Sequence, residues 1–150
     1  MADPTGNSLA VTLFSEILTN EQLIRNRLSR VLPKGMKISH FSVLNHLAGA
    51  SEERSPAQLA KSFHVTRGAM TNTLTKLEWA GYVHIRPDWD DARRKRVAIS
   101  PAGRAARAVA VAAIAPMISQ VVAELGDEKV RSALPVLREL RIKLGQRDDG

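Results

Sequence analysis

The segment 55–100 constrains the fold most, because it places two separately capped helices only a few residues apart. Ser55-Pro56 opens the first helix, predicted over 56–62: the serine hydroxyl can cap the first turn, and proline fits a position whose N–H would be unpaired anyway. Thr66 can cap the second helix, predicted over 67–80. Two short helices joined by so tight a turn predict a helix-turn-helix.

A β-hairpin is predicted directly after the second helix, which ends at Gly81. Alternation and β-branched residues over 82–86 favour one strand, and 93–99 can return as the other. The stretch between them, 87–92, is acidic and rich in turn-forming residues. The whole segment therefore predicts a helix-turn-helix followed by a charged β-wing.

Further helices are predicted on both sides of this segment. Apolar residues recur at three- and four-residue steps over 9–31, 101–125 and 128–144, and Ser39 can cap a shorter helix over 40–49. The helix over 101–125 is apolar nearly all round, which requires burial on more than one side. We therefore expect a mainly α fold with a small two-stranded β-wing.

Composition narrows the classes of function. The chain has no cysteine, which excludes disulfides, cysteine-ligated zinc, thiol nucleophiles and thiol redox sensing. Because it lacks a nucleophile elbow, a phosphate-binding glycine loop and metal-ligand spacing, we expect neither an enzyme nor a cofactor or metal site. Its 22 Lys+Arg against 15 Asp+Glu leave a net charge of +7, which suggests an anionic partner.

The sequence also lacks membrane and export signals. No apolar run approaches the roughly 18 residues of a membrane span, and the longest, Val109–Met117, is alanine-rich and about half that length. Met1–Ser8 is polar, without the basic and apolar regions of a signal peptide. We expect a cytoplasmic protein with no membrane partner.

The second helix of the pair is expected to be buried on one face and bare on the other. Its inward-facing residues are expected to be Val65, Met70, Leu74 and Leu77. The opposite face, with no acid and no bulky aliphatic, consists of Arg67, Gly68, Thr71, Asn72, Thr75 and Lys76. Such a face suits the major groove of double-stranded DNA, where arginine favours guanine and asparagine favours adenine. Gly68 either lets the backbone approach DNA closely or is simply tolerated in the first turn.

Charges on the hairpin supply the electrostatic part of the prediction. Four consecutive cations are Arg93, Arg94, Lys95 and Arg96, and three carboxylates precede them at Asp88, Asp90 and Asp91. On a strand the cations would charge both faces, with Arg94 and Arg96 on one side, which suits phosphate contact or minor-groove insertion. The carboxylates are expected to form the turn and to pair with the arginines, Asp91 with Arg93 in particular. They lack the spacing of a calcium loop.

Two tryptophans flank the wing. Trp79 ends the second helix and is expected to pack under the wing rather than to stack on DNA. Trp89 lies at the predicted tip, where it either touches DNA or folds back onto the hairpin.

Taken in order, these motifs resemble the MarR (multiple antibiotic resistance regulator) family of winged helix-turn-helix repressors. The matching residues are Ser55–Ala60, Val65–Arg67, Leu77–Val83, Asp91–Arg93, Val97–Ser100 and Gly103. The motifs cover 55–103, and the helices before and after agree with the family's plan. The resemblance therefore spans nearly the whole chain.

The resemblance implies a single domain over 1–150. Its winged helix-turn-helix lobe would occupy 39–100, and its helical dimerisation region 9–35 and 101–145. It implies a homodimer on a pseudo-palindromic operator, with recognition helices in the major groove and wings in the minor groove. Asp91 and Arg93 match wing residues that, in the family, hold the wing and contact DNA. The neighbouring Arg94 and Arg96 are also expected to contact DNA.

The resemblance also implies a repressor relieved by a small aromatic or anionic effector. Family effectors bind between the dimer helices and the DNA-binding lobe, and the candidate pocket residues here are Phe14, His40, Phe41 and Met117. The plainer interpretation is a capping or surface histidine and three core side chains.

This sequence departs from the family pattern at three positions. Asn72 stands where a basic residue is frequent, which leaves the base preference open. Pro116 and Pro135 lie inside predicted helices, which each is expected to kink or split. Both prolines leave the dimer geometry open.

Two other functions compete with this interpretation. An architectural DNA-binding protein without an effector would bind by charge, with steep salt dependence and little sequence preference. The hydrogen-bonding face around Asn72 favours base readout and leaves that alternative open. A protein–protein adaptor built on a winged helix is disfavoured, because it gains nothing evident from four consecutive cations.

Overall fold

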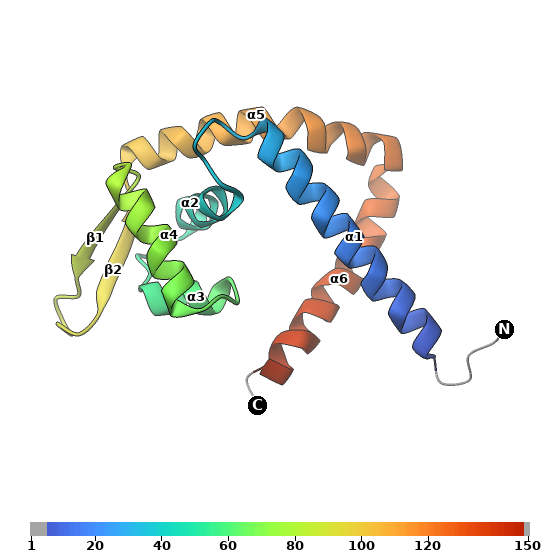
Figure 1. Ribbon diagram of the computed structural model, residues 1–150, viewed down its shortest axis with the longest axis horizontal. Helices are drawn as coiled ribbons and strands as arrows, with labels where there is room; N and C mark the ends of the chain where they lie inside the picture. The colour runs from blue at the N-terminus through green and yellow to red at the C-terminus, as the bar shows by residue number, and fades with distance from the viewer. Residues whose placement is uncertain (1–5, 149–150) are drawn as a thin grey trace. The chain divides into compact units, whose positions relative to one another are not determined.

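The computed structural model describes residues 6–148, which form helices and one two-stranded sheet (Figure 1). In chain order the elements are α1 (Asn7–Val31), α2 (Ile38–Gly49), α3 (Pro56–Ser62), α4 (Arg67–Trp79), β1 (Val83–Pro87), β2 (Lys95–Ile99), α5 (Pro101–Leu125) and α6 (Asp127–Asp148). Contacts divide the chain into two compact units, and the boundary along the chain falls within α5, after Ala113. The mainly helical fold class with a small β-wing is confirmed.

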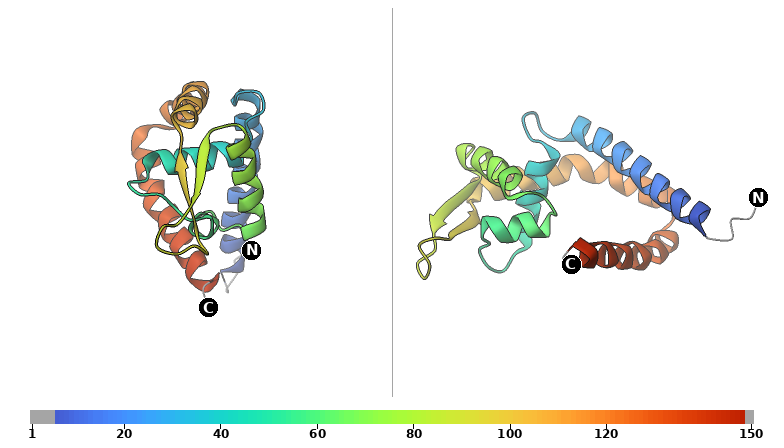
Figure 2. Two further views of the ribbon diagram at one scale, coloured as in Figure 1. Left: turned by 90° about the vertical axis from the view of Figure 1, so that its left-hand side faces the viewer. Right: turned by 60° about the horizontal axis from the view of Figure 1, so that its bottom comes forward.

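One apolar core holds α2, α3, α4 and the hairpin together in the first unit. Its buried members are Val43, Leu44, Leu47, Leu59, Ala60, Met70, Leu74, Leu77, Val83 and Val97. The helices contribute one face each, and the two valines close the core from the sheet. Figure 2 shows the hairpin leaving this helical cluster with its turn at the far end. The core therefore fixes the base of the wing and leaves its tip free of the helices.

The sheet pairs β1 with β2 in antiparallel register, from Val83 opposite Ile99 to Pro87 opposite Lys95. Arg54 extends it by one bridge, which the sequence did not predict: its N–H bonds to the Val97 carbonyl at 3.2 Å, and the N–H of Val97 returns a bond at 2.7 Å. This bridge ties the start of the helix-turn-helix to the wing.

The second strand begins at Lys95, so the expectation of a strand over 93–99 was wrong at its start. The N–H of Asp88 donates to the carbonyl of Arg94, and the N–H of Arg94 donates to that of Asp91, both at 3.0 Å. These bonds place Arg93 and Arg94 in the turn. Only two of the four consecutive cations therefore lie on the strand.

Two local predictions about the helices were also wrong. Helix α2 begins at Ile38 with Lys37 at the N-cap, so Ser39 lies inside the helix and does not cap it. Val65 is 44% exposed, because it belongs to the turn before α4, where its N–H bonds to the Ala60 carbonyl at 3.0 Å.

A buried hydroxyl joins the wing to α5. Ser100 donates to the carbonyl of Gly81 at 2.6 Å and accepts from the N–H of Gly103 at 2.9 Å. A Cβ added at Gly103 would lie 2.1 Å from the carbonyl oxygen of Tyr82, so only glycine fits there. The end of α4 and the start of α5 are thus held against each other.

Helices α5 and α6 run unbroken through Pro116 and Pro135, so neither proline splits its helix. Among the described helices, α5 is long and apolar enough by length and composition to cross a membrane, although no uninterrupted apolar run is that long. Its first turns carry Arg104 and Arg107, which bond to the Ala48 carbonyl and the Asn45 side chain of α2. We therefore interpret α5 as a helix that packs against protein.

Candidate nucleic-acid interface

Two side-chain caps build the helix-turn-helix as the sequence predicts. The Ser55 hydroxyl accepts from the N–H of Gln58 at 3.1 Å, and the Gln58 side chain accepts from the N–H of Ser55 at 2.9 Å. The Thr66 hydroxyl accepts from the N–H of Ala69 at 3.1 Å. His64 has a positive φ of 54°, the left-handed conformation that reverses the chain between α3 and α4.

Helix α4 turns one face inward and one outward. Met70, Leu74 and Leu77 are buried, whereas the residues of the opposite face are exposed at Arg67, Gly68, Thr71, Asn72 and Lys76. Thr75 is half-buried and donates its hydroxyl to the Thr71 carbonyl at 2.8 Å, so it offers mainly its methyl group. The predicted residues thus share one surface of α4, with Thr75 at its margin.

Gly68 lies at the open part of this surface. A Cβ built there meets no atom of the described chain within 4 Å. Its packing within the molecule therefore does not require glycine, in contrast to Gly103.

The wing turn is organised by carboxylates. Asp91 accepts from the N–H of Arg93 at 3.0 Å, and its oxygens lie 3.5 Å from Nε of Arg93 and of Arg94. The predicted pairing of Asp91 with Arg93 is confirmed. The two arginine side chains nevertheless remain 94% and 69% exposed, so their guanidinium groups are accessible to a phosphate group.

Arg96 is engaged differently from its neighbours. Its Nε donates to Oδ2 of Asp88 at 3.1 Å, and both side chains are substantially covered. A hydrogen bond from the N–H of Asp90, and then the Arg96 charge, hold the pKa of Asp88 below its usual value. This pair braces the turn from within.

Trp79 does not pack under the wing, so that expectation was wrong. Its side chain is 81% exposed, because the buried positions of α4 are 70, 74 and 77 and residue 79 points away from them. Trp89 at the wing tip is 83% exposed and has the Arg86 guanidinium over its ring, 5.7 Å from the centroid.

Comparison with known proteins identifies this arrangement. The MarR family model matches residues 34–94, which include α2, α3, α4, β1 and the wing turn. The transcriptional regulator BldR from Sulfolobus solfataricus is 25% identical, with a TM-score of 0.75 over 92% of this chain and 99% of that one. Residues 34–94 thus match the MarR family, and the chain has the fold of MarR-family transcriptional regulators.

Two further solved structures share the fold at lower identity. A mutant of MarR from E. coli complexed with operator DNA is 20% identical, with a TM-score of 0.73 over 93% of this chain and 99% of that one. The PcaV regulator from Streptomyces coelicolor, in complex with its natural ligand, is 16% identical, with a TM-score of 0.72 over 94% and 97%. No curated protein matches the sequence.

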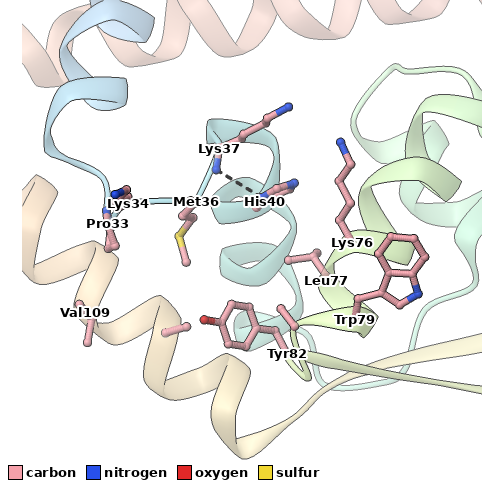
Figure 3. Close-up of a pocket in the computed structure, with 13 residues that line it drawn as sticks. Pro33, Lys34, Met36, Lys37, His40, Lys76, Leu77, Trp79, Tyr82 and Val109 are labelled. Carbon is pink, nitrogen blue, oxygen red and sulfur yellow. Dashed lines mark hydrogen bonds between the residues drawn. The ribbon is translucent and has the colours of Figure 1, made fainter.

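This MarR-like chain also contains a cavity of 590 Å³ within its first unit (Figure 3). Three lysines are among its lining residues: Lys34 and Lys37 from the connection between α1 and α2, and Lys76 from α4. Its aromatic and apolar lining includes Trp79, Tyr82, Met36 and Val109. Cations beside apolar surface suit a small anion that carries a hydrophobic or aromatic body.

His40 is the predicted pocket residue that lies in this cavity. Its Nδ1 accepts from the N–H of Lys37 at 3.3 Å, so the neutral ring carries its proton on Nε2. Burial, and then the charges of Lys37 and Lys76, hold the pKa of His40 below its ordinary value. Phe14 and Phe41 are not among the lining residues, and Met117 belongs to the second unit.

Sequence reasoning missed several residues of these sites. Lys34 and Lys37 flank Gly35 in a short basic connection, and that local charge was the available signal. Lys76 was assigned to DNA, although it also lines the cavity. Glu53, which bonds Arg86 at 2.8 Å, had no signal, because that contact joins segments distant in sequence.

Proposed function

We propose that the chain is a sequence-specific repressor that binds double-stranded DNA as a homodimer in the cytoplasm. The observation that carries the proposal is the exposed face of α4, where Arg67, Thr71 and Asn72 can reach base edges without a carboxylate beside them. The full set assigned to DNA comprises Arg67, Gly68, Thr71, Asn72, Thr75, Lys76, Arg93 and Arg94, with Asp91 holding the wing. Arg96 is assigned to the wing's internal support, because Asp88 already engages it.

The exposed apolar surface supports a dimer. Large hydrophobic side chains are exposed on α1, α5 and α6, among them Leu9, Leu18, Ile24, Val109, Leu125 and Val136. Such surface is unfavourable in water, and a second copy is the occupant we propose for it. On this proposal 9–35 and 101–145 form the dimerisation region and 39–100 the DNA-binding lobe of a single domain, 1–150. The two recognition helices would then address half-sites of a pseudo-palindrome about 34 Å apart.

The cavity supports modulation by a small anionic, aromatic effector. Three lysines surround it, and one of them, Lys76, is a residue of the recognition helix. A bound anion would therefore contact α4 directly, so its binding energy could favour one placement of that helix over another. Release of the operator by such a ligand is the regulation we propose.

The test is a fluorescence-anisotropy titration at about 150 mM salt, because affinity for DNA has meaning only at a stated salt concentration. DNA from upstream of the protein's own gene is compared with a scrambled duplex of equal length. A preference of roughly a thousandfold or more, saturating at one dimer per site, supports the proposal. Equal and salt-sensitive binding to both duplexes favours the architectural alternative, and absence of binding at low salt overturns both.

A further inference from the structure

The wing tip presents a large aromatic side chain to solvent. Trp89 lies between β1 and β2, and its side chain is 83% exposed. An indole exposed to this extent offers a large apolar surface and one N–H donor for contact with a partner. The residues around Trp89 indicate the chemistry of that partner.

Hydrogen bonds fix the loop that carries this indole. The N–H of Asp90 donates to Oδ1 of Asp88 at 2.9 Å, and the Asp88 and Arg94 backbones close the turn at 3.0 Å. Arg96 then anchors the other carboxylate oxygen of Asp88 at 3.1 Å. The indole is thus carried by a braced turn.

A second set of contacts orients the ring itself. The Arg86 guanidinium lies over Trp89 with its central carbon 5.7 Å from the ring centroid. That guanidinium is held by Oε1 of Glu53 at 2.8 Å and by the Pro87 carbonyl at 3.1 Å. A guanidinium fixed by two acceptors restricts the ring that stacks on it, so the indole is held and yet remains exposed.

The neighbours of Trp89 indicate the partner's chemistry. Arg93 and Arg94 are exposed in the same turn, at 94% and 69% of their side chains. Cations beside a protruding apolar side chain match a DNA groove, where the cations contact phosphates and the apolar group lies against sugars or base edges. A purely apolar protein partner would leave these cations without compensation.

We propose that Trp89 is a DNA-contacting residue that inserts into the minor groove beside the operator's major-groove sites, and that Glu53 positions it through Arg86. The proposal rests on the wing entering DNA as proposed above. Trp89 contributes contact area without charge, and Arg93 and Arg94 contribute charge. The two contributions can therefore be separated by salt dependence.

The experiment uses the chain's two tryptophans. In the Trp79→Phe variant Trp89 is the only indole, and its emission and its quenching by acrylamide are followed while operator duplex is added. We expect the emission to change and the acrylamide quenching constant to fall at least about twofold on saturation, because the groove covers the ring. If Trp79→Phe fails to fold, the difference between the wild-type signal and that of Trp89→Phe gives the same readout.

Affinity supplies the second arm. Trp89→Ala should weaken operator binding on the order of tenfold, the size of one good groove contact, while leaving the salt slope unchanged. Arg94→Ala should lower the salt slope by about one.

The positioning role of Glu53 has its own readout. Glu53→Ala should increase the rotational mobility of Trp89 in the free protein, measured by time-resolved fluorescence anisotropy. Glu53→Gln keeps an acceptor oxygen and should therefore show the lower mobility of the wild type. If the protein binds DNA with normal affinity while Trp89 emission and quenching stay unchanged, the proposal for Trp89 is overturned. The proposed regulator function is then unaffected. A change in Trp89 emission that depends on protein concentration in the absence of DNA would assign Trp89 to a protein–protein contact, which also overturns the proposal. Absence of DNA binding by every variant and the wild type overturns both.

Discussion

The hydroxyl of Ser100 donates a 2.6 Å hydrogen bond to the carbonyl of Gly81, so one buried side chain links the end of the recognition helix to the start of α5. The same oxygen accepts from the N–H of Gly103 at 2.9 Å. Ser100→Ala should therefore lower the free energy of unfolding by about 1–3 kcal/mol, since it removes a cap and leaves a carbonyl without its partner. Urea denaturation followed by circular dichroism measures this. Ser55→Ala, which removes a more exposed cap, is the control and should cost about 1 kcal/mol.

Gly103 and Gly68 form a matched pair for substitution by alanine. Gly103→Ala would place a methyl group 2.1 Å from the Tyr82 carbonyl oxygen, so we expect a loss of roughly 3 kcal/mol or more, or a failure to fold. Gly68→Ala has open space and should raise the free energy of unfolding by up to about 1 kcal/mol. If the backbone at Gly68 approaches DNA, this stabilised variant should bind the operator more weakly. Equal affinity would mean that Gly68 is merely tolerated.

The sequence predicted those parts of the fold that are set by neighbouring residues. Caps at Ser55 and Thr66 and the apolar steps of α4 specify the helix-turn-helix almost completely, because each signal acts within one turn of chain. The Arg54–Val97 bridge and the Glu53–Arg86 pair escaped prediction, because they join segments more than thirty residues apart. No local pattern records such contacts.

The candidate sites show the same division. The exposure of the face with Arg67 and Asn72 followed from helical periodicity. The start of β2 could not be predicted from the local pattern, because backbone hydrogen bonds place Arg93 and Arg94 in the turn. The exposure of Trp79 was not predicted, because aromatic character alone does not show which face of the last helical turn a residue occupies. The cavity lysines came together only through tertiary packing.

Asn72 and Arg94 should separate base readout from phosphate attraction. Asn72→Ala should cost about 1–3 kcal/mol of binding free energy on the preferred operator and almost nothing on a scrambled duplex. Arg94→Ala should weaken binding to both duplexes and lower the slope of log affinity against log salt by about one. Anisotropy titrations at several salt concentrations measure both effects. Unchanged discrimination in Asn72→Ala would remove that residue from base readout.

The Asp88–Arg96 pair should make the wing sensitive to acid. Because the pKa of Asp88 is lowered in the folded state, its carboxylate contributes stability above its ordinary pKa, and that contribution is lost as pH falls through the folded value. The protection factors of the wing amides, which correct for the intrinsic pH dependence of exchange, should therefore fall selectively below about pH 4. Asp88→Asn should show the faster wing exchange already at neutral pH, whereas Asp90→Asn keeps the carboxylate of Asp88 and should not. Uniform loss of protection across the core instead would place the acid effect elsewhere.

His40 should couple anion binding in the cavity to proton uptake. Burial and two neighbouring lysines lower the pKa of its imidazole, so the ring is neutral at pH 7 in the free protein. A carboxylate beside it compensates those lysines and raises that pKa, so affinity should increase as pH falls from about 8 to 6 and level off below the pKa of the free protein. Benzoate, which remains ionised over this range, is the probe, and calorimetry in buffers of different ionisation enthalpy counts the protons taken up. His40→Gln should abolish the pH dependence, Lys76→Gln should weaken binding at every pH, and His84→Gln, on β1, should change neither. Benzoate binding that is independent of pH in the wild type would separate His40 from the ligand.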